Sequence, residues 1–198
     1  VKKITQSIVI LPHFMSWTIV SMLSVAILSA NGVVNQLITM VGGKTIEFYN
    51  TPSVWPAILV ILKVWQGAGF GSIVYLATIT GIDASIYEAA AVDGASKTQC
   101  IFKVTLPMLK NTIIMLTIMS VGKIFNGDFG MIYAMVGSNS ILYPTTDVID
   151  TYLFRQLLEN PSMGQTAAVG LIQSILGFGF VVLCNKVANK WSPESALF

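Results

Sequence analysis

The chain has 198 residues, of which 54% are hydrophobic and only 10% are charged. An average soluble domain carries about 25% charged residues, so this chain has too little charge to cover a water-exposed surface of its size. Its mean hydropathy of +0.74 points the same way, and we expect lipid to cover part of the surface. The net charge of +2 gives no indication of nucleic-acid binding.

The cysteine and histidine content argues against common enzyme and metal sites. Two cysteines, Cys100 and Cys184, are too few for a disulfide framework. The single histidine, His13, leaves no basis for a cysteine and histidine zinc site or for a catalytic triad. We therefore predict no catalytic residue, no metal site and no cofactor bound by this chain.

Stretches with little or no charge predict an all-α membrane protein with about four transmembrane helices. A bilayer core of roughly 30 Å needs about 20 helical residues, and a single helix satisfies its own backbone groups. The third stretch is shorter and carries Lys110 and Lys123 near its ends, where long side chains can reach the headgroups. Buried helices of a soluble core would need a polar shell that this composition does not supply. The predicted spans are about 5–30, 54–82, 107–126 and 164–186.

The positions of lysine and arginine predict the orientation of these spans. With the amino end inside, the inner segments contain most of the basic residues, as the positive-inside rule favours. The amino end of this chain, the loop 83–107 and the carboxyl end would then be cytosolic, where thiols stay reduced. The inner residues are Lys2, Lys3, Lys97, Lys103, Lys110, Lys186 and Lys190, and the outer ones are Lys44 and Arg155.

The inner loop 83–107 is predicted to form two short helices with a sharp corner between them. Asp83 can cap the first helix, and Asp93 with Gly94 is the pair most able to end it. Ser96 can cap the second helix. Apolar residues at helical spacing give the first helix a face that must pack on something, and lipid headgroups are one such surface. These residues are Ile82, Ile86, Ala89 and Ala90.

The same loop resembles the EAA signature of ABC-transporter permeases, in which Glu-Ala-Ala is followed by Gly and, farther on, by Ile-x-Leu-Pro. Val104 stands where isoleucine is usual. In that family the short helix docks in a groove of the ATPase subunit and passes its motion to the membrane helices. The resemblance therefore implies a coupling site at Glu88, Ala89, Ala90, Asp93, Gly94, Leu106 and Pro107.

Four further stretches resemble the LplB-type permeases within this MalFG-like family, which are assigned to uptake of oligosaccharides and uronate-containing glycans. They are residues 11–14, 65–69, 147–152 and 170–174. Because the matches cover nearly the whole chain, residues 1–198 are expected to form one permease domain. Such permeases typically have six spans with the EAA loop after the fourth. The spans here would then be the third to the sixth, and the start at Val1 rather than Met fits an absent amino-terminal part.

The resemblance also implies an assembly and a mechanism. This chain would be one permease subunit of an ATP-driven importer that moves carbohydrate across the cytoplasmic membrane by alternating access. The expected substrate is an oligosaccharide, including uronate-containing ones. The expected partners are a second permease subunit, two ATPase subunits that use ATP, an extracellular or periplasmic solute-binding protein, and the lipid bilayer, with no nucleic acid.

Two glycine-containing motifs do not indicate nucleotide binding. Gly43-Lys44-Thr45 resembles the end of a phosphate-binding loop, but position 38, where that loop needs glycine, is Ile. Gly67, Gly69 and Gly71 lie inside a predicted span, where close helix packing or a local bend is the expected role.

Lys63 is the one charge well inside a predicted span, at a cost of roughly 2.5 to 3.5 kcal/mol unless it faces water or a partner. A pore position would explain it, and a cation would suit an acidic saccharide. The alternatives are a salt bridge to the partner permease and a side chain that snorkels. Trp65 offers an aromatic face for sugar carbons and Gln66 offers polar groups for hydroxyls. We therefore predict that Lys63, Gln66 and Trp65 border the substrate path.

The outer segment 145–158 is predicted to form a short amphipathic helix with Thr145 or Thr146 as its cap. The resemblance implies that the outer gate and the contact with the solute-binding protein lie here; the alternative is a helix resting on the membrane surface. Its acidic residues lie near the amino end and its apolar face is Ile149, Tyr152, Leu153 and Leu157. The predicted contact residues are Asp147, Asp150 and Tyr152.

Two other classes of function compete with an importer subunit. A secondary transporter or channel would be expected to carry intramembrane carboxylates or a selectivity ring, whereas all nine acidic residues lie outside the predicted uncharged stretches. A membrane anchor or signalling subunit would need neither small-residue runs nor an intramembrane lysine.

Overall fold

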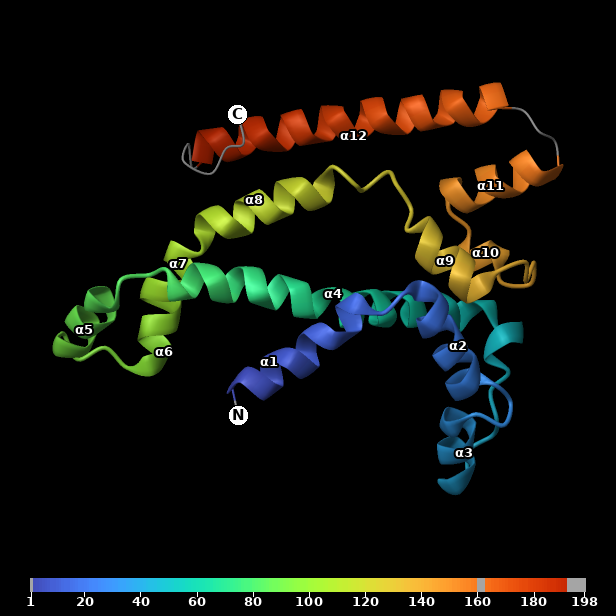
Figure 1. Ribbon diagram of the computed structural model, residues 1–198, viewed down its shortest axis with the longest axis horizontal. Helices are drawn as coiled ribbons and strands as arrows, with labels where there is room; N and C mark the ends of the chain where they lie inside the picture. Colours follow the sequence, from blue (N-terminus) through green and yellow to red (C-terminus); the bar gives the residue numbers. More distant parts are fainter. Residues whose placement is uncertain (1, 160–162, 192–198) are drawn as a thin grey trace. The chain divides into compact units, whose positions relative to one another are not determined.

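The computed structural model describes residues 2–159 and 163–191, and these residues form helices and connecting loops without a β-strand (Figure 1). The predicted all-α fold is therefore confirmed, while residues 192–198 of the predicted domain lie outside the described part. Contacts divide the chain into two compact units, Val1–Gly69 with Asn126–Thr166, and Phe70–Phe125 with Ala167–Phe198. Two long helices, α4 (Trp55–Thr80) and α12 (Met163–Trp191), contribute residues to both units.

The first unit contains most of the short helices. In chain order they are α1 (Lys2–Ile10), the 3-10 turn η1 (Leu11–Phe14), α2 (Trp17–Leu28), α3 (Val33–Met40), the 3-10 turns η2 (Phe48–Asn50) and η3 (Pro52–Val54), the start of α4, α9 (Phe129–Val136), α10 (Tyr143–Thr146) and α11 (Ile149–Glu159). The second unit contains the end of α4, α5 (Ala84–Val92), α6 (Lys97–Cys100), the π-helical turn η4 (Ile101–Thr105), α7 (Leu106–Met108), α8 (Lys110–Val121) and most of α12.

Three helical segments in the described part are long and apolar enough to cross a membrane: Trp17–Met40, Pro52–Thr80 and Met163–Lys190. The last two overlap the predicted spans 54–82 and 164–186. A fourth candidate is the bent pair Lys97–Met108 and Lys110–Val121, whose two parts meet at 55°. It begins earlier than the predicted span 107–126.

The predicted first span, 5–30, differs most from the structure because its helix is interrupted. Pro12 lies in η1 and cannot donate a backbone hydrogen bond, which ends α1. Ser16 then starts α2, since its side chain accepts a hydrogen bond from the Ile19 amide at 3.3 Å. The candidate span consequently runs from Trp17 rather than from the amino end.

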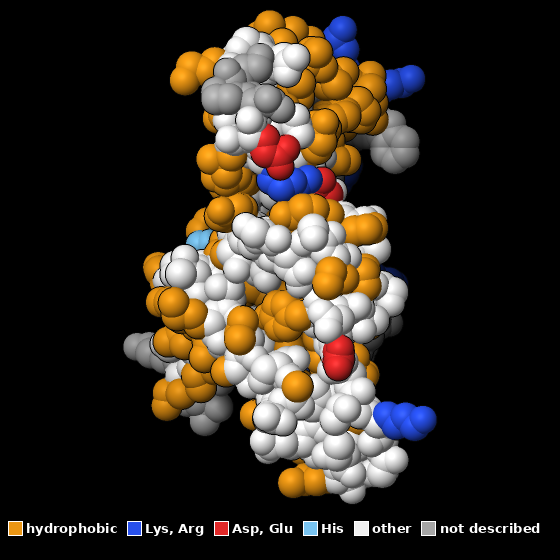
Figure 2. Space-filling view, turned by 90° about the vertical axis from the view of Figure 1, so that its right-hand side faces the viewer, with side chains coloured by type: hydrophobic (Ala, Val, Ile, Leu, Met, Phe, Trp, Pro, Cys, Tyr) orange, Lys and Arg blue, Asp and Glu red, His pale blue; other side chains and the backbone are white. Residues whose placement is uncertain are grey.

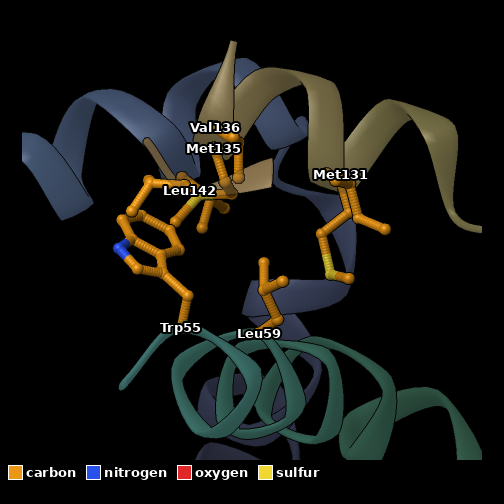
Figure 3. Packing of buried hydrophobic residues seen from close by; sticks show 8 residues of the cluster. Trp55, Leu59, Met131, Met135, Val136 and Leu142 are labelled. Atoms are coloured by element: carbon orange, nitrogen blue, oxygen red, sulfur yellow. The ribbon is translucent and has the colours of Figure 1, made fainter. Parts of the chain in front are cut away.

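The core of the first unit lies where α4 faces α9. Trp55 and Leu59 point from α4 toward Met131, Met135 and Val136 of α9 (Figure 3). Trp55 is fully buried, and its indole N–H donates to the Phe48 carbonyl at 2.7 Å. Burying each such side chain contributes about 1.5 to 3 kcal/mol, so this cluster stabilises the packing of α9 in the first unit.

Gly69 allows α1 to approach α4 at backbone distance. A β-carbon at this position would lie 2.2 Å from the Val9 carbonyl oxygen, which no larger residue can tolerate. The same construction at Gly67 and Gly71 meets nothing within 4 Å. The predicted role in close helix packing is therefore confirmed for Gly69.

In the second unit, the turn that follows α8 is connected to α12 by polar and aromatic contacts. Gln173 is buried and its side-chain amide donates to the Phe125 carbonyl at 2.8 Å. The rings of Phe125 and Phe180 meet edge to face with centroids 5.2 Å apart. A hydrogen bond at 3.2 Å between the hydroxyls of Thr78 and Thr112 links α4 to α8.

Much of the surface is apolar. Figure 2 shows one face on which hydrophobic side chains are widely exposed and charged side chains gather at few places. Large apolar side chains such as Val60, Leu171 and Phe178 expose 62%, 62% and 70% of their area. Soluble monomers rarely expose contiguous apolar surface of this extent, so lipid or partner chains are expected to cover it.

Candidate functional site

The loop 83–107 begins with helix α5, whose amino end is capped as the sequence predicts. The Asp83 carboxylate accepts a hydrogen bond from the Ser85 amide at 2.9 Å, which starts α5 and lowers the pKa of Asp83. The predicted cap is therefore confirmed. No residue of α5 is buried within this chain.

Gly94 ends α5 with a left-handed residue. Its φ of +74° is a conformation that residues with a β-carbon rarely adopt. The Gly94 amide donates to the Ala91 carbonyl at 3.1 Å, and the Ala95 amide donates to the Ala90 carbonyl at 2.9 Å. These two bonds form a Schellman motif, which satisfies the last carbonyls of the helix and turns the chain sharply.

The predicted second cap is also confirmed. Ser96 accepts a hydrogen bond from the Gln99 amide, and the Gln99 side chain accepts one from the Ser96 amide, which together form a capping box. Together with Gly94, this cap fixes both sides of the corner between α5 and α6.

Leu106 and Pro107 lie where the following helix leaves regular geometry. Pro107 has no N–H for the carbonyl four residues before it, and its ring would clash with that carbonyl in a regular helix. The preceding turn, η4, is widened, and the Leu106 amide donates to the Ile101 carbonyl five residues earlier. The 55° bend follows within a few residues, so the predicted Leu-Pro pair marks a deformable part of the chain.

The remaining residues of the predicted coupling site lie on α5 or at its end. Glu88 and Ala89 are exposed, Ala90 is half-buried, and Asp93 is the carboxyl-terminal cap. Within the described residues the Glu88 side chain has no hydrogen bond and no ion pair. Ile86 exposes 36% of its area and Ile82 is half-buried, so this chain covers only part of the predicted apolar face.

Tyr87 connects α5 to the helix that follows, which the sequence did not predict. Its hydroxyl lies 3.0 Å from the Thr105 hydroxyl, and Thr105 donates to the Cys100 carbonyl at 3.3 Å. Because the Thr105 proton is used in that bond, Tyr87 is the donor to Thr105. The sequence signal that could have pointed to this contact is Tyr87 itself, a single polar aromatic residue in an alanine-rich helix.

Lys63 forms an ion pair with Asp128 of its own chain. Its ammonium nitrogen lies 2.5 Å from a carboxylate oxygen of Asp128 and 5.7 Å from the centroid of the Trp17 ring. The other oxygen of Asp128 caps α9 by accepting from the Met131 amide at 3.0 Å. The Lys63 side chain remains 55% exposed, so it keeps access to ligands.

Gln66 lies on the same side of α4 as Lys63. Its amide donates to the Met15 carbonyl at 3.0 Å, at the interruption before α2. Trp65 exposes 42% of its area and makes no described ring contact. The structure thus brings Lys63 and Gln66 to one junction of the first unit and leaves Trp65 apart from it.

The outer segment folds differently from its predicted single helix. Thr145 and Thr146 lie inside α10, where their hydroxyls donate to the carbonyls of Pro52 and Leu142, so neither caps the next helix. Helix α10 ends at Thr146, with Asp147 as its carboxyl-terminal cap, and α11 begins at Ile149. The predicted caps were wrong because Pro144 favours an extra short helix that includes both threonines.

Asp147 and Arg155 form a two-pronged ion pair at this segment. The two guanidinium nitrogens lie 3.0 and 2.5 Å from the Asp147 oxygens, and Thr151 donates to Asp147 at 2.6 Å. The hydrogen bond from Arg155 lowers the pKa of Asp147. The guanidinium also lies 3.9 Å from the Tyr143 ring centroid, so Arg155 organises a site that the sequence did not predict.

Asp150 is likewise engaged within the chain. Its carboxylate accepts a hydrogen bond from the Gly127 amide at 2.5 Å, just before α9. Tyr152 exposes 51% of its area. Of the three predicted contacts with a binding protein, the two carboxylates therefore have partners in this chain, and Tyr152 presents most of its surface.

The described residues contain no group of three or more His, Cys, Asp or Glu side chains placed to bind a metal ion. The thiols of Cys100 and Cys184 are unpaired and half-buried.

The sequence of the chain matches a known protein family over nearly its whole length. Residues 1–191 match the family described as the inner-membrane component of binding-protein-dependent transport systems. The chain belongs to this family of membrane permeases. It is therefore a membrane-embedded protein of a transport system, and the predicted resemblance is confirmed.

Two relatives from Bacillus subtilis (strain 168) match over 194 residues. The polygalacturonan/rhamnogalacturonan transport system permease protein YteP is 33% identical, and Protein LplB is 32% identical. Each alignment covers 98% of this chain and 60% of the relative, so the chain spans about 60% of the length of these proteins.

Solved structures show the same fold. A chain of a bacterial alginate ABC transporter, crystallised with an alginate pentasaccharide-bound periplasmic protein, matches with a TM-score of 0.89 and 35% identity. The match covers 96% of this chain and 66% of that chain. A second structure of a transporter for the acidic polysaccharide alginate matches with a TM-score of 0.90.

Proposed function

We propose that this chain is a permease subunit of an ATP-driven importer of acidic oligosaccharides. The observation that carries the proposal is the exposed helix α5, with Glu88 free of partners in the described part and Gly94 in the left-handed turn. A surface helix of this kind, fixed at both ends and uncovered by its own chain, is suited to a groove in another protein. Relatives that transport uronate-containing glycans support the substrate class.

The proposed complex contains a second permease subunit, two ATPase subunits and a solute-binding protein. ATP is used by the ATPase subunits, and this chain catalyses no reaction. The amino end of this chain, α5 and the carboxyl end face the cytosol, in agreement with the positive-inside count. The relatives give no support to the alternative of a secondary transporter or channel.

We further propose that Lys63 and Gln66 border the substrate path, with Trp65 as a more distant member. Lys63 is more than half exposed although it is paired with Asp128, and an ammonium group has three donors, so it can bind a uronate carboxylate without leaving its partner. At the outer end, Tyr152 supplies the exposed surface for the binding protein, and Asp147 and Asp150 keep its helix in place.

The substrate class can be tested in proteoliposomes that contain the complete transporter, its binding protein and ATP. Uptake of an oligogalacturonide should exceed uptake of a neutral glucan of equal length. Lys63→Met should reduce uptake of the oligogalacturonide, whereas Asp128→Asn breaks the same ion pair but keeps the cation and should reduce it less. Equal uptake of both sugars, or equal effects of both variants, would contradict the proposed role of Lys63.

The position of the path can be tested by thiol labelling. Cys100 and Cys184 are first replaced by serine, and a single cysteine is then placed at position 63 or 66. A water-soluble thiol reagent should label these cysteines, and the rate should change on addition of loaded binding protein and ATP. Absence of labelling in every state would show that both positions are packed.

A further inference from the structure

The helix α5 has one side-chain hydrogen bond to another helical element in the part of the chain that the structure describes. That bond joins Tyr87 to Thr105. The other hydrogen bonds of α5 and its ends are local ones with Asp83, Gly94 and Ala95. The covalent corner and this pair of hydroxyls are therefore two connections through which movement of α5 can reach the following helix.

Thr105 occupies a place where the backbone can change its geometry. It is the last residue of the π-helical turn η4, and it precedes Leu106 and Pro107. Its hydroxyl donates to the Cys100 carbonyl, five residues earlier, which is the spacing of the widened turn. Because π-turns are local departures from a regular helix, small forces on such a turn change its hydrogen-bond register.

The bend lies within the next turn. The Leu109 amide donates to the Thr105 carbonyl at 3.0 Å, and Leu109 is the buried residue between the two arms that meet at 55°. Thr105 is thus joined through its side chain to α5 and through its carbonyl to the residue at the bend. The sequence of contacts from Tyr87 to Thr105 to Leu109 lies entirely within the second unit.

We propose that Tyr87 is a positioning residue that transmits the movement of α5 to the bend at Leu109 through the hydroxyl of Thr105. This proposal rests on the proposed function, since it assumes that an ATPase moves α5. It assigns different roles to neighbouring residues: Glu88 and Gly94 present the helix to the ATPase, whereas Tyr87 faces this chain's own membrane helix and carries the movement onward.

The test uses the complete transporter with the variants Tyr87→Phe, Thr105→Val and their combination. Co-purification of the ATPase and its basal hydrolysis should stay as in the native complex. ATP-driven uptake should fall about fivefold in each single variant, the factor expected from loss of one hydrogen bond of typical strength. The double variant should lose no more than either single variant, because both remove the same bond.

Two further variants separate transmission from a general effect on folding. Thr105→Ser keeps the hydroxyl and should keep uptake near the native rate. Thr98→Val makes the same type of change on α6, at an exposed residue without a described side-chain hydrogen bond, and should also have little effect. Uptake unaffected by Tyr87→Phe would overturn the proposal, and so would additive losses in the double variant.

The proposed function fails in a different way. If the native complex contains no ATPase, or hydrolyses ATP without uptake, both the importer function and the role of Tyr87 are rejected. If the native complex transports but Tyr87→Phe loses the ATPase, the importer function stands. Tyr87 would then belong to the docking surface, and its role in transmission would be rejected.

Discussion

Lys63 of α4 and Asp128 at the start of α9 form an ion pair, although 65 positions separate them in the sequence. Asp128 uses its other oxygen to cap α9, so one carboxylate serves both the helix end and the intramembrane cation. A lysine in a span is costly unless it meets water or an opposite charge. Asp128 therefore makes Lys63 tolerable at this position.

This arrangement predicts unequal effects of single and double substitutions. Lys63→Met leaves the carboxylate of Asp128 without its cation, and should destabilise the chain by about 1 to 3 kcal/mol. Combining it with Asp128→Asn removes both charges and keeps a capping oxygen, so part of the loss should be recovered. Thermal unfolding in detergent measures both effects, with the outer-loop variant Lys44→Met as control. Equal melting temperatures for the single and double variants would contradict the coupling.

Gln173 should stabilise the turn that follows α8 through its hydrogen bond to the Phe125 carbonyl. An unsatisfied carbonyl at membrane depth is costly, while measured intramembrane hydrogen bonds contribute about 0.6 kcal/mol on average and up to about 2 kcal/mol. Gln173→Leu should therefore lower stability by about 1 kcal/mol. Gln173→Glu, whose carboxylate faces the carbonyl without a donor, should lower it more.

The matched control for this pair is Gln165→Leu. Gln165 lies on the same helix, is exposed and has no described hydrogen bond. Its replacement should leave the melting temperature unchanged in detergent. A loss for Gln165→Leu as large as that for Gln173→Leu would show that the effect comes from helix composition rather than from the bond to Phe125.

The ion pair between Asp147 and Arg155 predicts the pH dependence of the outer segment. Arg155 lowers the pKa of Asp147 in the folded chain, so the stabilisation is complete above the ordinary aspartate pKa of about 4. It is lost as the pH falls through the lowered value. The protection factors of the α11 amides, which correct for the pH dependence of intrinsic exchange, should therefore fall below about pH 4 by more than in Asp147→Asn. Identical pH profiles for the native chain and the variant would refute this.

The effect of replacing Gly94 should depend on whether the new residue can adopt a positive φ, and not on the size of its side chain. No atom lies within 4 Å of a β-carbon placed there, and the φ of +74° remains the constraint. Gly94→Leu should cost about 1 to 2 kcal/mol in the turn, whereas Gly94→Asn should cost less because asparagine tolerates this region. The transport rate of the complete complex should decrease from Gly94 to Gly94→Asn to Gly94→Leu. The reverse order for Asn and Leu would mean that side-chain contacts decide.

Local features of the structure followed from the sequence, whereas contacts between distant segments did not. Asp83, Gly94 and Ser96 act on backbone groups within a few residues, so their types and spacing sufficed to predict the coupling loop. The partner of Lys63 could not be predicted, because Asp128 lies 65 positions away and outside every uncharged stretch.

Two other differences between the predictions and the structure have separate causes. The first predicted span was drawn as continuous because the prediction followed the absence of charged residues, and Pro12 is uncharged although it interrupts the helix. The hydrogen bond between Tyr87 and Thr105 depends on the corner that Gly94 sets, which determines the residues of the next helix that meet α5. The proline signal was present in the sequence, whereas the contact between Tyr87 and Thr105 required three-dimensional information.

The proposed function requires that α5 docks this chain onto an ATPase. The most direct measurement is the amount of ATPase that co-purifies with the intact complex carrying Glu88→Lys, compared with Glu159→Lys, the same charge reversal in an exposed glutamate on the predicted outer side. We expect Glu88→Lys to lose most of the ATPase and its ATP-driven uptake, and Glu159→Lys to retain the ATPase. Full retention of ATPase and uptake in Glu88→Lys would contradict the claim.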